Sequence, residues 1–103
     1  MGVVIVRPIA DAELDYHARY LADRSLSAGQ RLYTAATETF AILANAPGIG
    51  ALITSRNPRV DGLRFIGVTG LPMYLVFYRE VAGGVEVVRF LHASQDWGAA
   101  LQE

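Results

Sequence analysis

The stretch LRFIGVTGLPMYLVFYREVAGGVEVVRFLHA, residues 63–93, alternates runs of β-branched and aromatic residues with two short glycine-containing turns. β-Branched and aromatic residues favour strands, whereas glycine and proline favour turns. The pattern predicts strands over residues 63–70, 72–80 and 85–93. Because their connections are short, these strands should be antiparallel neighbours. The middle strand is apolar on both faces, which is typical of a central strand.

The residues before this stretch predict one further strand and two helices. Residues 2–7 are apolar and β-branched, and they predict a first strand. Apolar residues then recur at helical spacing over residues 9–24 and again over about 27–45. Ser27 followed by Gln30 has the spacing of a capping box, so we expect the second helix to begin there.

The predicted order of elements is therefore β-α-α-β-β-β. Two helices joined by so short a loop should form an antiparallel hairpin, and residues 51–62 are expected to be a polar surface loop. The hairpin would cover one face of a small, mainly antiparallel, twisted sheet. We expect an α+β fold, with residues 1–103 as one domain, because the chain has 103 residues.

The charge composition excludes several classes of protein. All nine basic residues are arginine, cysteine is absent, and the formal net charge is -1. Lysine-dependent Schiff-base chemistry, a P-loop, disulfides and thiol catalysis are therefore excluded. Nucleic-acid-binding proteins normally carry a basic excess, which this chain lacks overall. No apolar run approaches about 18 residues and no secretory signal is evident, so we expect a soluble cytoplasmic protein.

A metal centre is not expected from the residue types. Glu13 and His17 are four residues apart on a predicted helix, which would bring two possible ligands together. A metal site needs more ligands than these two, and the chain contains only two histidines. We therefore expect neither a metal ion nor a cofactor.

Four segments form a specific pattern when their order and spacing are taken together. They are ADAELDYHARYLAD (10–23), SAGQRLYTAATETFAILANAPGIG (27–50), GLRFIGVTGLPMYLVFYRE (62–80) and GGVEVVRFLHASQDW (83–97). This pattern resembles the ParE/RelE superfamily of bacterial toxins over nearly the whole chain. It is more similar to the ParE branch than to the RelE branch. Arg7 before Pro8 departs from the serine or threonine common at that position.

The resemblance implies the toxin component of a type II toxin–antitoxin system. A ParE-like toxin poisons DNA gyrase, and a ParD-like antitoxin neutralises it by folding onto it. The resemblance also implies a hetero-oligomer with the antitoxin, which contacts operator DNA only through the antitoxin. The alternative is a RelE-like toxin, which shares the fold and cleaves mRNA on the ribosome. A third possibility is a nontoxic relative that survives as a binding partner only.

The residue types favour a toxin that binds over one that catalyses. RNA cleavage needs groups that exchange protons, and arginine stays protonated at neutral pH. If the chain cleaved RNA, its catalytic residues would be Arg64, Arg79, Arg89 and His92, with a carboxylate from Glu80 or Glu86. Strand alternation places Arg89 with Val85, Val87 and Leu91, and His92 on the opposite face.

Two contact surfaces are expected for a binding toxin. The target would contact Arg79, Arg89, His92 and Trp97. The antitoxin would contact, or be supported by, Leu14, Tyr16, Tyr20, Leu21 and Phe40. Tyrosine in particular is enriched at interface hot spots. Structural roles remain open for several of these residues: the arginines would pair with Glu80, Glu86 or Asp61, and Trp97 would cover the core.

Overall fold

The computed structural model describes residues 2–101 and confirms the predicted α+β fold. The elements are β1 (Val3–Val6), α1 (Pro8–Ala22), α2 (Leu26–Asn45), β2 (Ala51–Leu52), β3 (Arg64–Val68), β4 (Leu71–Val81), β5 (Gly84–His92) and α3 (Trp97–Ala100). The strands form one sheet in the order β1-β5-β4-β3-β2. Strands β2 to β5 pair antiparallel, and β1 pairs parallel with β5. The strand predicted to be central, β4, is central.

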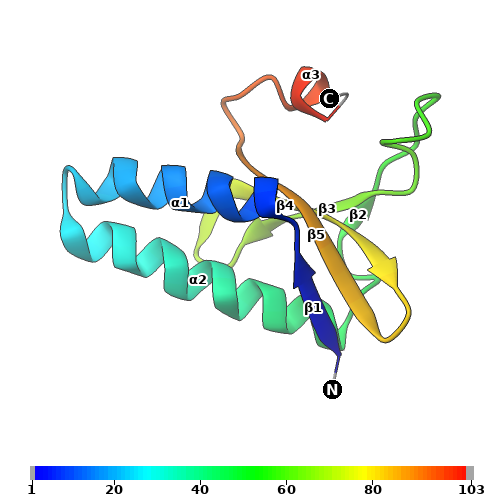
Figure 1. Cartoon of the computed structure of the whole chain (residues 1–103), viewed down its shortest axis with the longest axis horizontal. Coiled ribbons are helices and arrows are strands. Elements are labelled where there is room, and N and C mark those ends of the chain that lie inside the picture. The colour runs from blue at the N-terminus through cyan, green and yellow to red at the C-terminus, as the bar shows by residue number, and fades with distance from the viewer. Residues whose placement is uncertain (1, 102–103) are drawn as a thin grey trace.

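Helices α1 and α2 form the predicted antiparallel hairpin, which covers one face of the sheet (Figure 1). Pro8 begins α1, where its missing N–H would have had no helical partner. Gly29 lies where the helices approach closely, because a Cβ at this position would come within 2.7 Å of the Ala18 carbonyl oxygen. No helix within residues 2–101 combines the length and the apolar character needed to cross a membrane.

The start of α2 corrects the sequence prediction. Ser25 is the N-cap, and its Oγ accepts a hydrogen bond from the Ala28 N–H at 3.4 Å. Ser27 lies inside the first turn, so the predicted Ser27–Gln30 capping box is wrong. The end of α1 is close to this N-cap, since the N–H of Ser25 still bonds to the Leu21 carbonyl at 2.8 Å. The junction contains two serines, Ser25 and Ser27, and either could be the N-cap of α2 on sequence grounds.

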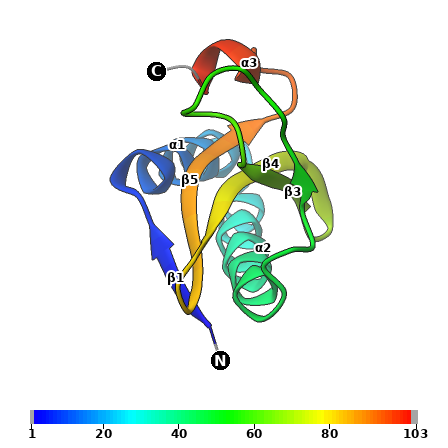
Figure 2. The same ribbon diagram turned by 90° about the vertical axis from the view of Figure 1, so that its right-hand side faces the viewer.

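Apolar side chains form a core on each face of the sheet. The core under the hairpin includes Ala10, Leu14, Ala18, Leu32, Ala36, Leu43, Val76, Tyr78, Val85, Val87 and Phe90. The core on the opposite face contains Val60, Leu63, Phe77, Val88, Leu91 and Leu101, with Trp97 packed against it. Figure 2 shows α3 beside the segment that precedes β3, and together they cover this second core.

The predicted polar loop at 51–62 and the C-terminal residues contain structure that the sequence analysis missed. Ala51 and Leu52 form β2, which pairs with β3 at the edge of the sheet. Val60 is buried in the second core. A two-residue strand and a four-residue helix are too short to produce a readable periodicity, so neither β2 nor α3 was predicted.

A β-bulge interrupts the alternation of side chains along β5. Phe77 of β4 pairs with Arg89, but the next residue, Tyr78, pairs with Val87. Val88 is therefore an extra residue on β5, and the faces of the following residues are exchanged. Val87 packs under the hairpin, whereas Val88 and Arg89 line one pocket on the other side. The prediction that Arg89 shares a face with Val87 is wrong for this reason.

Candidate functional site

Two pockets flank β5, one on each face of the sheet. The first has a volume of about 350 Å³, and we call it the arginine pocket; it is lined by Arg7, Ile9, Arg59, Leu63, Arg79, Val88, Arg89 and Leu101. The second has a volume of about 360 Å³, and we call it the aromatic pocket; it is lined by Tyr16, His17, Tyr20, Tyr74, His92, Ser94 and Gln95. The aromatic pocket opens beside α1, and the arginine pocket opens on the opposite face.

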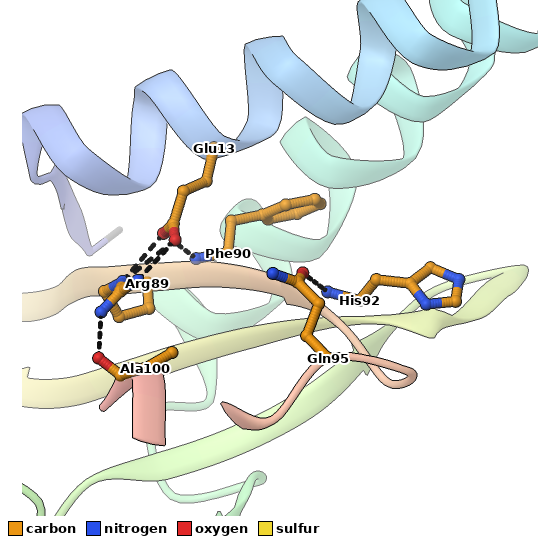
Figure 3. Close-up of polar contacts among 6 residues, drawn as sticks. All are labelled: Glu13, Arg89, Phe90, His92, Gln95 and Ala100. Atoms are coloured by element: carbon orange, nitrogen blue, oxygen red, sulfur yellow. Dashed lines mark hydrogen bonds and ion pairs between the residues drawn. The ribbon is translucent and has the colours of Figure 1, made fainter. Parts of the chain in front are cut away.

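Arg89 is fixed at the edge of β5 by Glu13 of α1 (Figure 3). Its Nε donates to the two carboxylate oxygens of Glu13 at 3.0 and 3.1 Å, and its Nη2 donates at 2.7 Å. Glu13 Oε1 also accepts the Phe90 N–H at 3.0 Å, and Arg89 Nη1 donates to the Ala100 carbonyl. Strand β1 pairs with residues 84–87 of β5. Beyond residue 87, the Glu13 carboxylate accepts a backbone N–H of β5 that a neighbouring strand would otherwise accept.

The other arginines of the arginine pocket have few hydrogen-bond acceptors between them. Arg7 donates to Glu86 through Nε at 3.1 Å and Nη2 at 3.2 Å. Arg79 Nε lies 3.9 Å from Glu86 Oε1, which is too long for a hydrogen bond. This Nε is buried, and it has no hydrogen-bond partner among residues 2–101. Arg59 forms no ion pair within the same part of the chain.

The lining of the arginine pocket favours anion binding and not proton transfer. Within the described chain, neither a carboxylate nor a histidine lines it. The nearby carboxylates, Glu13 and Glu86, are both engaged in ion pairs with arginine. Arginine cannot accept a proton at neutral pH. The pocket can therefore hold a negative group, but its lining side chains offer no general base.

The aromatic pocket is a cluster of stacked and edge-to-face rings. The ring of Tyr74 lies 4.9 Å from that of His92 and 5.5 Å from that of His17, both in edge-to-face geometry. Tyr16 and Tyr20 form the outer wall from α1, and they are 67% and 50% exposed. Such half-exposed aromatic residues supply large contact areas at protein interfaces. This pocket has the character of a protein-binding surface.

His17 adds no charge to the aromatic pocket at neutral pH. Burial lowers the pKa of His17, and the nearby His92 lowers it further, against smaller raising effects from Gln95 and Glu13. His17 is therefore neutral at pH 7. The Nδ1 of His92 lies 2.7 Å from Ser94 Oγ, and it accepts the Ser94 N–H at 3.1 Å.

The four residues of the alternative ribonuclease set do not converge. They lie in three places: Arg64 near β2, Arg79 and Arg89 in the arginine pocket, and His92 in the aromatic pocket. Arg64 Nη1 donates to the carbonyls of Gly50 at 2.9 Å and Gly48 at 3.3 Å. Its Nε lies 3.7 Å from Glu80, one of the structural partners expected from the sequence. Arg64 thus supports the segment before β2.

The residues predicted to contact the target divide in the same way. Arg79 and Arg89 line the arginine pocket, whereas His92 lines the aromatic pocket. Trp97 packs at ring distances of 5.9 Å from Phe65 and 5.6 Å from Phe77. The alternative role of Trp97 as a cover on the core is confirmed. Arg79 lies near Glu86 as expected, but the main partner of Arg89, Glu13, was not among the predicted carboxylates.

The residues predicted to contact the antitoxin are of two kinds. Leu14 is only 5% exposed, so it is a core residue that can support a partner surface but not form one. Leu21 and Phe40 are partly buried against the same core. Tyr16 and Tyr20 are exposed beside the aromatic pocket. Tyr16 and Tyr20 are thus exposed enough for a direct contact, and Leu21 and Phe40 remain partly accessible.

Sequence reasoning missed Glu13 as a partner of Arg89, and it missed Arg7 and Arg59 as members of the arginine pocket. Glu13 is 76 residues from Arg89, so no local spacing links them. Arg7 stands at the junction of β1 and α1, and Arg59 in the loop before β3. The parallel pairing of β1 with β5 brings Arg7 beside β5, and the loop before β3 brings Arg59 to the same pocket. A sequence signal for that pairing does not exist in the residues themselves.

The helical hairpin on a mixed sheet has the α+β architecture expected for the ParE/RelE superfamily of small toxins. The family model described as "ParE toxin of type II toxin-antitoxin system, parDE" matches residues 4–97, and the chain belongs to this family. The solved structure "Chromosomal ParDE TA system from P. aeruginosa" is similar in fold, with a TM-score of 0.66. It is 18% identical, and the match covers 89% of this chain and 96% of that chain. No curated protein sequence matches.

Proposed function

We propose that this ParE toxin inhibits bacterial growth by binding DNA gyrase, and that a ParD-like antitoxin neutralises it. Membership of the ParE family supports both parts of the proposal. The observation that carries the binding mechanism is the separation of His92 from Arg79 and Arg89 by the sheet. A histidine on the far side of β5 cannot exchange a proton with a group held in the arginine pocket. The toxin therefore acts by contact, without cutting a substrate.

The antitoxin surface in this proposal is the outer face of α1 at the aromatic pocket. Tyr16 and Tyr20 contact the antitoxin, and Leu14 supports them from the core. An antitoxin segment that folds on the toxin gains affinity by burying such aromatic surface. The complex is a hetero-oligomer, and it reaches operator DNA only through the antitoxin.

The target surface in this proposal lies on the opposite face of the sheet. Arg79 and Trp97 belong to that face, while Arg89 is its fixed wall. With target and antitoxin on different faces, the antitoxin can neutralise the toxin in two ways. It can block the approach of gyrase sterically, or it can hold the toxin away from gyrase. Contacts with gyrase made by charged and aromatic residues would fit the usual composition of interface hot spots.

The test uses the purified toxin and purified gyrase with supercoiled plasmid DNA. We expect double-strand breaks that are revealed when gyrase is denatured with detergent, and we expect the antitoxin to suppress them. In a parallel translation reaction, the mRNA should stay intact. Cleaved mRNA together with undamaged plasmid would overturn the proposal in favour of the RelE-like alternative. Loss of cleavage in a His92→Ala variant would then make His92 the first catalytic candidate.

A further inference from the structure

The arginine pocket contains a buried donor that the described chain leaves without an acceptor. Buried polar groups in proteins are almost always hydrogen-bonded, so each exception requires an explanation. Arg79 Nε is such an exception, because its nearest carboxylate oxygen, on Glu86, is 3.9 Å away. Glu86 is already occupied by a two-pronged contact from Arg7. A further acceptor in the pocket would complete the coordination of Arg79.

The pocket also holds more positive than negative charge. Arg7, Arg59 and Arg79 contribute three guanidinium groups, and the one carboxylate paired with any of them within residues 2–101 is Glu86. Arg89 forms the wall and is excluded from this balance, because Glu13 and Ala100 already hold it. The local excess exists although the whole chain has a net charge of -1.

The N-terminus of α1 adds to the positive potential of the pocket. Arg7 is its N-cap, and Ile9 of its first turn also lines the pocket. No side chain caps the N-terminal N–H groups of this helix. Uncapped N–H groups and the positive end of the helix dipole both favour an anion nearby. The helix end and the arginines thus act on the same cavity.

We propose that the arginine pocket binds a phosphate group. The three guanidinium groups come from three separate segments: the β1–α1 junction, the loop before β3, and β4. A carboxylate presents two oxygens in one plane, whereas a phosphate presents oxygens in several directions and can accept from donors around it. The cavity of about 350 Å³ has room for a phosphate with part of the nucleoside that carries it.

This inference goes beyond the proposed gyrase binding and does not depend on it. A phosphate can come from a nucleic-acid backbone or from a free nucleotide, and both present the same chemistry to the pocket. The pocket chemistry fits either source, because guanidinium groups recognise phosphate in both. An acidic protein segment is the competing ligand class, and the test below separates it.

The test follows arginine Nε–Hε signals of the full-length toxin by 15N NMR while inorganic phosphate, dAMP or a short DNA oligonucleotide is added. We expect the Arg79 signal to shift on addition of each phosphate probe. Tighter binding of the oligonucleotide than of dAMP identifies a nucleic-acid backbone, and equal binding identifies a free phosphate group. Both results support the pocket as a phosphate site.

Variants assign the binding to the pocket. Arg79→Gln and Arg59→Gln should each weaken oligonucleotide binding about tenfold, because each removes a charge-assisted hydrogen bond. Arg31→Gln is the control with the same charge change, because Arg31 is exposed on α2 and outside the pocket. Arg59 is exposed in a loop, so its substitution leaves the fold intact even if Arg79→Gln does not.

Three outcomes would overturn the phosphate site. One is the absence of any shift at Arg79 with millimolar phosphate and oligonucleotide. Another is an equal loss of oligonucleotide binding in the Arg31 control, which would indicate a general charge effect. The third is tighter binding of an acidic peptide than of an oligonucleotide with the same net charge. That result would make the pocket a carboxylate site for a protein partner.

Discussion

The arginine pocket and the aromatic pocket lie on opposite sides of one strand and have opposite chemistry. Arg89 and His92 are three residues apart in the sequence, yet each belongs to a different pocket. The arginine pocket has charged walls held in place by ion pairs, with donors facing the cavity. The aromatic pocket has walls of stacked and edge-to-face rings and exposed tyrosines. One strand thus separates a pocket lined by arginines from a pocket lined by aromatic rings.

The difference follows from how the edge of β5 is covered. Strand β1 covers its first half, and Glu13 with Gln95 accept the N–H groups of Phe90 and His92 in its second half. An open edge strand is a site of unwanted pairing, and side chains that cap it prevent this. Glu13 also holds Arg89 in the arginine pocket, so one carboxylate protects the edge and positions a pocket wall.

Replacing Glu13 by alanine should have the largest effect on the stability of the protein. The substitution leaves the mostly buried Arg89, 13% exposed, without its carboxylate, and it also frees the Phe90 N–H. Removing one member of a buried ion pair destabilises a protein by about 3 kcal/mol. We expect a loss of this size in the free energy of unfolding, measured by urea denaturation.

The control for Glu13→Ala is an exposed ion pair on the same helix. Asp15 pairs with Arg19, but the Arg19 side chain is 79% exposed. Replacing Arg19 by alanine should therefore change stability by less than about 0.5 kcal/mol. If both substitutions destabilised the protein equally, the burial of the Glu13–Arg89 ion pair would not explain the effect of Glu13→Ala.

Tyr20→Ala tests whether the aromatic pocket is the protein-binding side. Tyr20 is half-exposed in its wall, and loss of an interface hot spot weakens binding by about 2 kcal/mol, or about thirtyfold. We expect this loss in antitoxin affinity, measured by calorimetry, without a change in phosphate binding. Tyr33→Ala is the matched control, since Tyr33 is 40% exposed on α2 but lies outside the pocket. An equal loss of antitoxin affinity in both variants would show that the aromatic pocket is not the specific binding site of the antitoxin.

The sequence predicted the elements that carry long periodic patterns and missed the contacts that join them. The helices, the three consecutive strands and the central place of β4 follow from apolar spacing and turn residues. The bulge at Val88 carries no marker in the sequence, because valine is usual in any strand. Because of this bulge, Arg89 lines the arginine pocket.

The candidate site was predictable in its residue types but not in its grouping. Tyr16 and Tyr20 were found because their helical spacing places them on one side of α1. Arg7 and Arg59 were missed, because only the tertiary fold brings them beside Arg79. The separation of His92 from Arg89 was predicted, although the alternation argument assigned the wrong neighbours to Arg89.

Arg7→Gln should have a small effect on stability despite its place in the arginine pocket. Its ion pair with Glu86 is exposed, with 46% of the Arg7 side chain accessible. Exposed pairs contribute less than about 1 kcal/mol, and salt screens them. We expect a loss of about 0.5 kcal/mol in urea denaturation at low salt. A loss as large as that of Glu13→Ala would show that the exposed and the buried ion pair of the arginine pocket contribute equally to stability.

The smallest effect that we expect is a difference between the two pockets in the pH dependence of stability. Burial and His92 lower the pKa of His17 below its ordinary value of 6.5, so the unfolded chain binds the proton more readily than the folded chain. This contribution to stability is fully present above pH 6.5. It is lost as the pH falls from 6.5 through the lower pKa of the folded state.

His17→Phe keeps a ring in the aromatic pocket but removes its titration. The difference in melting temperature between wild type and variant should be constant above pH 6.5 and should change in favour of the variant below it. Arg79→Gln is the matched control from the other side of β5, because no histidine of the described chain lines that pocket. It should leave the pH slope unchanged. A wild-type slope in His17→Phe would show that the titration of His17 does not cause the acid sensitivity.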